Sequence, residues 1–181
     1  RMDGVFSPEC PVVTSYRNTV EIMQTALRVA RKRPTPGQQE ARPVLRHGDA
    51  PQFLPFQTPK EQAALIASLI GAWRAQGLTS IAVISKSPKA LAALQKQLPP
   101  ELGAKLLDVN CETYEAGALL APASAVKGLE FDGVILADAG EAAFGDADLD
   151  ARLIYVCLTR ALHQLAVLYC GPLTPLLREE G

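Results

Sequence analysis

Three short stretches of the sequence place polar side chains among apolar ones in a way that a hydrophobic core does not require. In the first, residues 14–19, Tyr16 is followed by Arg17 directly before a predicted helix. An aromatic ring can stack on a base, and a guanidinium beside a helix N-terminus can bind phosphate. The structural alternative is that Tyr16 packs beneath the helix and Arg17 is solvated.

The second stretch, residues 124–132, lies between two predicted strands and contains Lys127, Gly128 and Glu130. Glycine permits close approach of the backbone to a ligand, lysine offers a cation, and glutamate can accept hydrogen bonds from sugar hydroxyls. An ordinary turn with a surface ion pair would use the same residues.

The third stretch, residues 152–161, reads as an apolar helix that carries Tyr155, Thr159 and Arg160 at positions i, i+4 and i+5. Arg160 lies near the end of this predicted helix, just before a strand. It can therefore either reach a ligand or simply satisfy the unpaired carbonyls of the last turn.

Helix and strand signals alternate along the chain. We predict helices over 18–32, from 58 to a stop at Gly77, from 87 to 99 and over about 149–162. The first three begin at capping signals, namely Asn18 with Glu21, Thr58-Pro59 and Ser87-Pro88. Predicted strands cover 44–45, 53–54, 80–85, 106–109, 118–121, 134–137 and 165–169. This alternation predicts an α/β domain with a mostly parallel sheet, which usually binds ligands at the carboxyl ends of its strands.

Composition limits the class of protein further. The 181 residues, 48% of them hydrophobic, fit one globular domain over 1–181, with a proline-rich connecting segment at 33–59, and exclude a disordered chain. No apolar run is long enough for a membrane span, so no membrane partner is expected. The 18 Lys and Arg against 19 Asp and Glu give a weaker basic bias than phosphate-backbone binders usually show. The one basic cluster fits a helix C-terminus, with a phosphate contact as the alternative; it comprises Arg28, Arg31, Lys32 and Arg33.

The four cysteines and two histidines fit no zinc template, so no bound metal is expected. The four cysteines show no CxxC spacing. Cys157 and Cys170 lie in apolar stretches and are predicted to be buried thiols. A reducing, cytoplasmic compartment suits this usage. The chain begins with Arg rather than Met, so we expect it to be part of a longer protein.

The three stretches together resemble the second motor domain of superfamily-one helicases of the UvrD/PcrA/Rep type. Residues 12–19, VVTSYRNT, resemble the "NYRST" motif, with Ser15 for Asn and Asn18 for Ser. Residues 126–134, VKGLEFDGV, resemble "AKGLEFDxV", and residues 152–161, RLIYVCLTRA, resemble "RLLYVAxTRA". The motifs occur in the family's order over about residues 12–170, and the proline-rich stretch is similar to the HelD-like branch, which acts on RNA polymerase.

This resemblance implies a RecA-like three-layer domain that forms one wall of an ATP cleft in an ATP-dependent DNA helicase or translocase. Tyr16 would stack on adenine, Arg17 would reach the γ-phosphate, Glu130 would bind near the ribose, and Arg160 would be the arginine finger. Lys127 and Gly128 would shape the loop that couples nucleotide to nucleic acid. The expected partners are DNA and an N-terminal motor domain of the same protein, which would hold Mg²⁺ with the ATP; the isolated domain is expected to be monomeric.

Two departures from the family pattern modify these expectations. Many relatives have Thr-x-His before "AKGLEF", where this sequence has Pro122, Ala123 and Ser124, so Ser124 is a weak substitute for a nucleic-acid contact. The sequence also contains no Gly-Lys pair and hence no P-loop, so this chain alone should not hydrolyse ATP. Two other readings stay open: a non-catalytic docking module, for RNA polymerase or a repair partner, and a free-standing nucleotide-binding protein.

Overall fold

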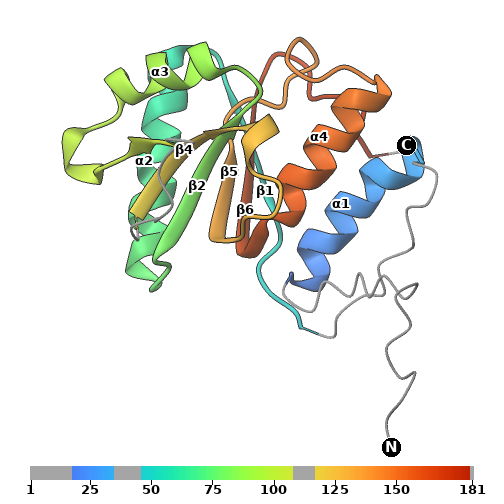
Figure 1. The fold of residues 1–181 in the computed structure, drawn as a ribbon, viewed down its shortest axis with the longest axis horizontal. Coiled ribbons are helices and arrows are strands. Elements are labelled where there is room, and N and C mark those ends of the chain that lie inside the picture. The colour runs from blue at the N-terminus through green and yellow to red at the C-terminus, as the bar shows by residue number, and fades with distance from the viewer. Residues whose placement is uncertain (1–17, 35–45, 108–116, 180–181) are drawn as a thin grey trace, which may run out of the picture.

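The computed structural model describes residues 18–34, 46–107 and 117–179, and within them strands and helices alternate (Figure 1). The strands are β1 (Gln52–Phe56), β2 (Ser80–Ser85), β3 (Lys105–Leu106), β4 (Gly117–Pro122), β5 (Phe131–Leu136) and β6 (Ala161–Cys170). The α-helices are α1 (Val20–Lys32), α2 (Pro59–Ala75), α3 (Pro88–Gln97) and α4 (Asp148–Thr159). Two short 3₁₀ turns, η1 (Pro100–Leu102) and η2 (Ala123–Ala125), complete the described elements.

The six strands form one parallel sheet in the order β1-β6-β5-β2-β4-β3. Helices α1 and α4 cover one face of this sheet, and α2 and α3 cover the other (Figure 1). Strand β2 shows how the sequence supports both layers, because Ile81 and Val83 pack toward α2 and α3 while Ala82 and Ile84 pack toward α1 and α4. The predicted α/β class with a mostly parallel, helix-flanked sheet is confirmed.

Capping residues set the starts of the helices as expected for α2 and α3. The hydroxyl of Thr58 accepts from the Glu61 amide at 3.1 Å, and that of Ser87 accepts from the Ala90 amide at 3.2 Å. At α1 the prediction is wrong by one residue. Thr19, not Asn18, caps the helix by accepting from the Ile22 amide at 3.3 Å, because the Asn18 side chain makes a long-range contact instead.

Other boundaries also differ from the predictions. Helix α4 ends at Thr159 rather than near 162, and β6 begins at Ala161, so Arg160 alone forms the turn between them. Strand β1 is longer than the predicted 53–54, and its Pro55 is tolerated because β1 is an edge strand. The predicted strand at 44–45 lies outside the described residues, as do positions 108 and 109 of the strand predicted over 106–109.

Helices α1 and α4 pack against each other in opposite directions. The start of α1 contacts the end of α4 through Asn18 and Thr159, and the end of α1 contacts the approach to α4 through Arg33 and Asp146. A shared buried cluster that includes Ile22 joins the two helices between these points. None of the helices in the described ranges is long and apolar enough to cross a membrane.

Candidate functional site

Two predicted site residues, Glu130 and Arg160, do not lie at the usual edge of a parallel sheet. Glu130 directly precedes β5 and Arg160 directly precedes β6, so both lie at the amino ends of neighbouring strands. The expectation of a site at the carboxyl ends is therefore wrong for these two residues. The reason is the direction of α4, which returns to the start of β6 and brings its C-terminal residue to the amino edge. Tyr16 and Arg17 lie outside the described residues.

All three polar stretches meet at the backbone turn of Arg160. Its carbonyl accepts from the Phe131 amide, the residue after Glu130, at 2.9 Å. The carbonyls on either side, of Thr159 and Ala161, accept from the Asn18 side-chain amide at 2.9 and 2.5 Å. Three successive carbonyls are thus held by one donor group from the first stretch and one from the second.

The assignment of the Asn18 amide is fixed by its surroundings. Asn18 is 2% exposed, and both of its partners are carbonyl oxygens, so only the nitrogen of the side chain can face them. Asn18 is the first described residue of the first stretch, so the described part of this stretch begins in contact with the Arg160 turn.

The guanidinium of Arg160 folds back along its own helix. Its Nε donates to the Val156 carbonyl at 3.2 Å and its Nη2 to the Thr159 hydroxyl at 3.3 Å, while the Thr159 hydroxyl donates to the Tyr155 carbonyl at 3.0 Å. These are the contacts expected from the structural alternative, in which an arginine satisfies the end of a helix. They are long bonds to neutral acceptors, which a stronger acceptor can replace.

The loop from η2 to β5 crosses from one edge of the sheet to the other. Ser124 lies in η2 at the carboxyl end of β4, whereas Glu130 lies at the amino end of β5. Buried Val126 anchors the loop, and Lys127 and Gly128 after it are exposed. Glu130 and Arg160 therefore lie at the same edge of the sheet, joined through the Phe131 amide, and Ser124 lies at the opposite edge.

Gly128 is required for its backbone angle rather than for space. Its φ of +84° lies in the left-handed region, and a Cβ atom built there would meet nothing within 4 Å. The Leu129 amide closes the turn on the Val126 carbonyl at 3.0 Å. The exposed backbone at Gly128 is thus open to a ligand, and no neighbouring atom in the described chain would clash with a larger side chain there.

The sequence interpretation missed residues at the amino edge. The Val20 amide donates to the Arg46 carbonyl at 2.9 Å, and the Arg46 guanidinium donates to the Leu162 carbonyl at 2.5 Å and lies 3.2 Å from His163 Nδ1. Arg46 therefore brings a second guanidinium beside the start of β6. Arg46 lies within the proline-rich segment, where the sequence has no periodic pattern, so nothing in the sequence marked it.

At the same edge, His47 approaches the Glu21 carboxylate at 2.8 Å and the Gly48 amide donates to it at 2.9 Å. The hydrogen bond from His47, followed by that from Gly48, lowers the pKa of Glu21. These contacts fasten the segment before β1 to the first turn of α1.

The two described cysteines differ. Cys157 is fully buried, as predicted, and burial raises the pKa of its thiol to about 12, against a smaller opposing effect of Arg160. The thiol therefore stays neutral and packs in the hydrophobic core. The prediction is wrong for Cys170, which is exposed because it is the last residue of β6, at the rim of the sheet.

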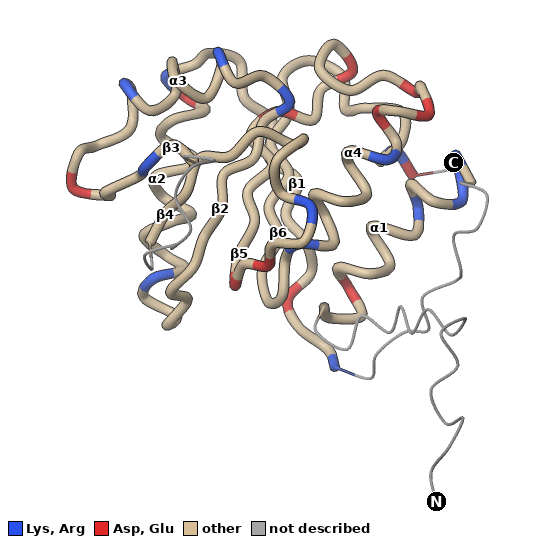
Figure 2. The backbone as a smooth tube through the Cα atoms, in the orientation of Figure 1, with Lys and Arg blue, Asp and Glu red and all other residues tan. Residues whose placement is uncertain are grey.

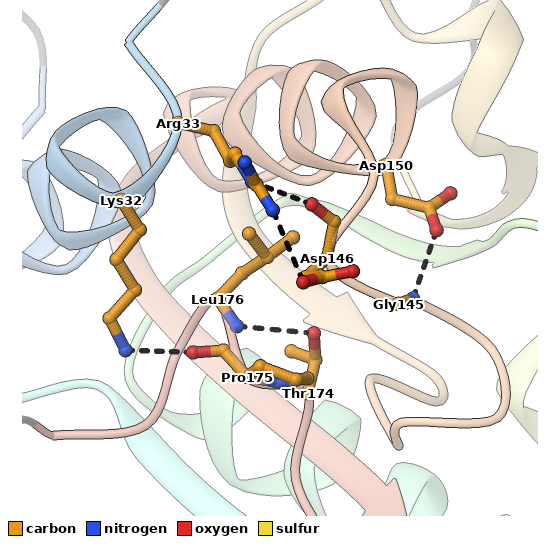
Figure 3. A network of polar contacts seen from close by, with 8 residues as sticks. All are labelled: Lys32, Arg33, Gly145, Asp146, Asp150, Thr174, Pro175 and Leu176. Atoms are coloured by element: carbon orange, nitrogen blue, oxygen red, sulfur yellow. Dashed lines mark hydrogen bonds and ion pairs between the residues drawn. The ribbon is translucent and has the colours of Figure 1, made fainter.

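The carboxyl edge carries a cavity of about 500 Å³ between the ends of β1, β2, β5 and β6, lined mainly by apolar atoms. Beside it, Lys86 Nζ lies 2.5 Å from Asp150 Oδ1 and 5.4 Å from the centre of the Phe144 ring. Asp150 in turn accepts from the Gly145 amide at 2.9 Å (Figure 3). This ion pair, which the sequence did not suggest, ties β2 to the start of α4.

The loop between β5 and α4 is also bound from α1. Arg33 donates to the Asp146 carbonyl at 2.8 Å and to its carboxylate at 3.1 Å, and Lys32 donates to the Pro175 carbonyl at 2.7 Å (Figure 3). Figure 2 shows basic residues at the end of α1 and both signs of charge interspersed over the described backbone. Arg28 of the same basic cluster lies 3.4 Å from the Glu179 carboxylate, so three of its four residues have structural partners.

Comparison with known families bears on the second and third stretches. The model of the family described as UvrD-like helicase C-terminal domain matches residues 124–168, which run from η2 into β6 and include the second and third stretches. Over these residues the chain is similar to a UvrD-like helicase C-terminal domain. The resemblance to this type of helicase motor domain is thereby confirmed, whereas the HelD-like branch stays a prediction.

A solved structure is similar to this chain over nearly its whole length. It is the crystal structure of the C-terminal domain of a possible DNA helicase from Lactobacillus plantarum WCFS1. The two chains are 27% identical with a TM-score of 0.67, and the match covers 90% of this chain and 92% of that one. The similarity includes the RecA-like fold predicted here. No curated protein gives a significant match.

Proposed function

We propose that this helicase domain forms one wall of the ATP cleft of a DNA helicase or translocase, with Arg160 as its arginine finger. One observation carries the proposal: the three stretches predicted to contact nucleotide converge on the three successive carbonyls around Arg160. The bond from Phe131 begins the pairing of β5 with β6, but the two side-chain bonds from Asn18 are not required by the sheet. A catalytic wall needs such a junction, because its charged groups must be held in fixed relative positions.

The polar groups of this wall fit different parts of ATP. Arg160 supplies a planar guanidinium for the γ-phosphate, and the exposed Glu130 carboxylate before β5 would accept hydrogen bonds near the ribose. Lys127 is exposed on the adjoining loop, which would couple nucleotide to nucleic acid. Arg17 and Tyr16 would complete the wall toward the γ-phosphate and the adenine. The P-loop and the Mg²⁺ ligands would come from an N-terminal motor domain of the same protein, which supplies the remaining charge stabilisation.

Arg160 must change rotamer to act. Releasing its two hydrogen bonds to Val156 and Thr159 costs about 1 kcal/mol each, whereas a bidentate contact with phosphate forms two charge-assisted bonds, each about twice as strong as a neutral one. The exchange is therefore favourable when phosphate is near. The backbone of Arg160 need not move, because its carbonyl and those beside it stay bonded.

The loop over residues 123–130 would connect this wall of the ATP cleft to the bound DNA. It joins the carboxyl end of β4, where Ser124 is exposed, to the amino end of β5, where Glu130 lies near the Arg160 turn. A change in the cleft that shifts this loop would reach the opposite edge, where DNA would bind. Closing and opening of the cleft would in this way drive movement along DNA.

Substitution of Arg160 tests the proposal in the full-length protein. Arg160→Ala should lower kcat of the DNA-stimulated ATPase by about a thousandfold or more, since arginine fingers contribute at least that much. Arg160→Lys should recover little of this, because lysine cannot make the planar bidentate contact. The matched control is Arg31→Ala, an exposed arginine on α1 whose loss should leave kcat unchanged. An Arg160→Ala enzyme with normal turnover would remove Arg160 from the mechanism.

One observation favours the docking-module alternative: the Arg160 side chain is bonded only to its own helix in the described contacts. A non-catalytic module would keep that arrangement permanently, and its full-length protein would lack a P-loop domain and ATPase activity. The ATPase measurement therefore also separates the two functions.

A further inference from the structure

Asn18 uses its side chain in a way that the helix it precedes does not require. Thr19 already caps α1, so the Asn18 amide is left to make contacts elsewhere. Both of its hydrogen bonds go to the turn between α4 and β6, across 141 and 143 residues of sequence. The last carbonyls of a helix have no partner within the helix, and here Asn18 satisfies one of them, that of Thr159.

The same amide also bonds the first residue of β6. Helix α4 and strand β6 are joined by Arg160 alone, whose φ of −77° and ψ of −16° still belong to the helical region. By binding the carbonyls of Thr159 and Ala161 together, Asn18 fixes the direction in which the chain leaves the helix. The Phe131 amide holds the carbonyl between them. The Cα–Cβ bond of Arg160 therefore leaves a rigid turn, and only its side-chain torsions remain free.

We propose that Asn18 is a positioning residue for Arg160, which holds the arginine turn and the start of α1 as one rigid unit. The inference rests on the proposed function of Arg160. Two donors on one buried planar group are needed for this role, and serine, which the related motif has at this position, can donate only one hydrogen bond.

This role predicts a specific kinetic effect. A shift of about 1 Å in a catalytic group can cost a hundredfold in rate. Asn18→Asp keeps the shape of the side chain but turns both donors into acceptors that repel the carbonyls. We expect it to lower kcat of the ATPase by about tenfold to a hundredfold, with little change in KM for ATP, because the arginine acts in the transition state.

The control is Thr25→Val on the same helix. Thr25 is 3% exposed and donates to the Glu21 carbonyl at 3.1 Å, so the variant also loses a buried side-chain hydrogen bond, but away from the Arg160 turn. It should leave kcat unchanged. Asn18→Ser, which retains one donor, should give a smaller loss than Asn18→Asp and replaces it as the test variant if the aspartate variant does not fold.

A double-mutant cycle in the full-length protein completes the experiment. If Asn18 acts through Arg160, the loss caused by Asn18→Asp should disappear in the Arg160→Ala background. A folded Asn18 variant with full kcat, or an equal loss in both backgrounds, would overturn the positioning role. If Arg160→Ala itself leaves kcat intact, it is the proposed function that fails, and the positioning role falls with it.

Discussion

The Lys86–Asp150 ion pair allows a quantitative prediction about stability. Asp150→Asn keeps the size of the side chain but removes its charge, and it leaves at most one acceptor for the Lys86 ammonium and the Gly145 amide. Breaking a fully buried pair costs about 3–5 kcal/mol, and breaking an exposed one costs about 0–1 kcal/mol. The side chains of Lys86 and Asp150 are 39% and 12% exposed, so this pair falls between the limits, and we expect a loss of about 2 kcal/mol.

Urea unfolding of this chain, followed by circular dichroism, measures that loss. The matched control is Asp148→Asn, an exposed carboxylate in the first turn of the same helix, which should cost about 1 kcal/mol or less through the helix dipole alone. Lys86→Met should be destabilising too, and the double variant should lose less than the sum of the two single losses. Equal stabilities of Asp150→Asn and Asp148→Asn would refute the assignment of this pair as a structural clamp on α4.

Three further outcomes follow from the described geometry. Gly128→Ala should destabilise the chain by about 1 kcal/mol, measured by urea unfolding, since its φ of +84° disfavours a Cβ; an unchanged midpoint would contradict this. Burial raises the pKa of Asp132, but hydrogen bonds such as that from the Thr79 amide outweigh burial and leave it below the ordinary 3.8. The Asp132 carboxylate therefore stabilises the fold above pH 3.8, and this contribution is lost as the pH falls through the lower pKa of the folded state. Asp132→Asn should make the melting temperature depend less on pH in that acid range. A melting temperature that falls as steeply with pH as in the unsubstituted chain would show that Asp132 is not the group responsible. In a variant whose other cysteines are Ser, Cys170 should react with a thiol reagent at once and Cys157 only upon unfolding, whereas two fast thiols would contradict the burial of Cys157.

The parts of the fold that depend on local chemistry could be predicted from the sequence. Thr58 and Ser87 followed by proline fixed the starts of two helices, because a hydroxyl that caps and a proline that fits the first turn act within a few residues. The nearly continuous apolar run over residues 80–85 indicated a strand covered on both faces. Alternation of such elements was enough for the fold class.

What the sequence could not show depends on contacts between distant residues. Asn18 and Thr19 are both good capping residues, and only the carbonyls at the end of α4 decide which of them caps α1. The end of α4 itself was placed too late because Ala161 and Leu162 suit a helix as well as a strand, and pairing with β5 draws them into β6. Lys86 and Asp150 are 64 positions apart, and neither stands in a pattern that points to the other.

The candidate site divides in the same way. The three stretches were recognisable from their residue types and their order, but their convergence on the Arg160 turn became visible only when β5, β6 and the two antiparallel helices were in place. Arg46 reaches the same edge from a segment without periodicity. Its role in anchoring the chain before β1 depends entirely on tertiary structure.

The most direct measurement of the central claim is a crystal structure of the full-length protein with Mg²⁺ and a non-hydrolysable ATP analogue. The Arg160 guanidinium should have left the Val156 carbonyl and should bind the γ-phosphate, while the Asn18 amide keeps its bonds to the carbonyls of Thr159 and Ala161. A nucleotide bound with Arg160 still folded against Val156, or bound far from the amino ends of β5 and β6, would contradict the account.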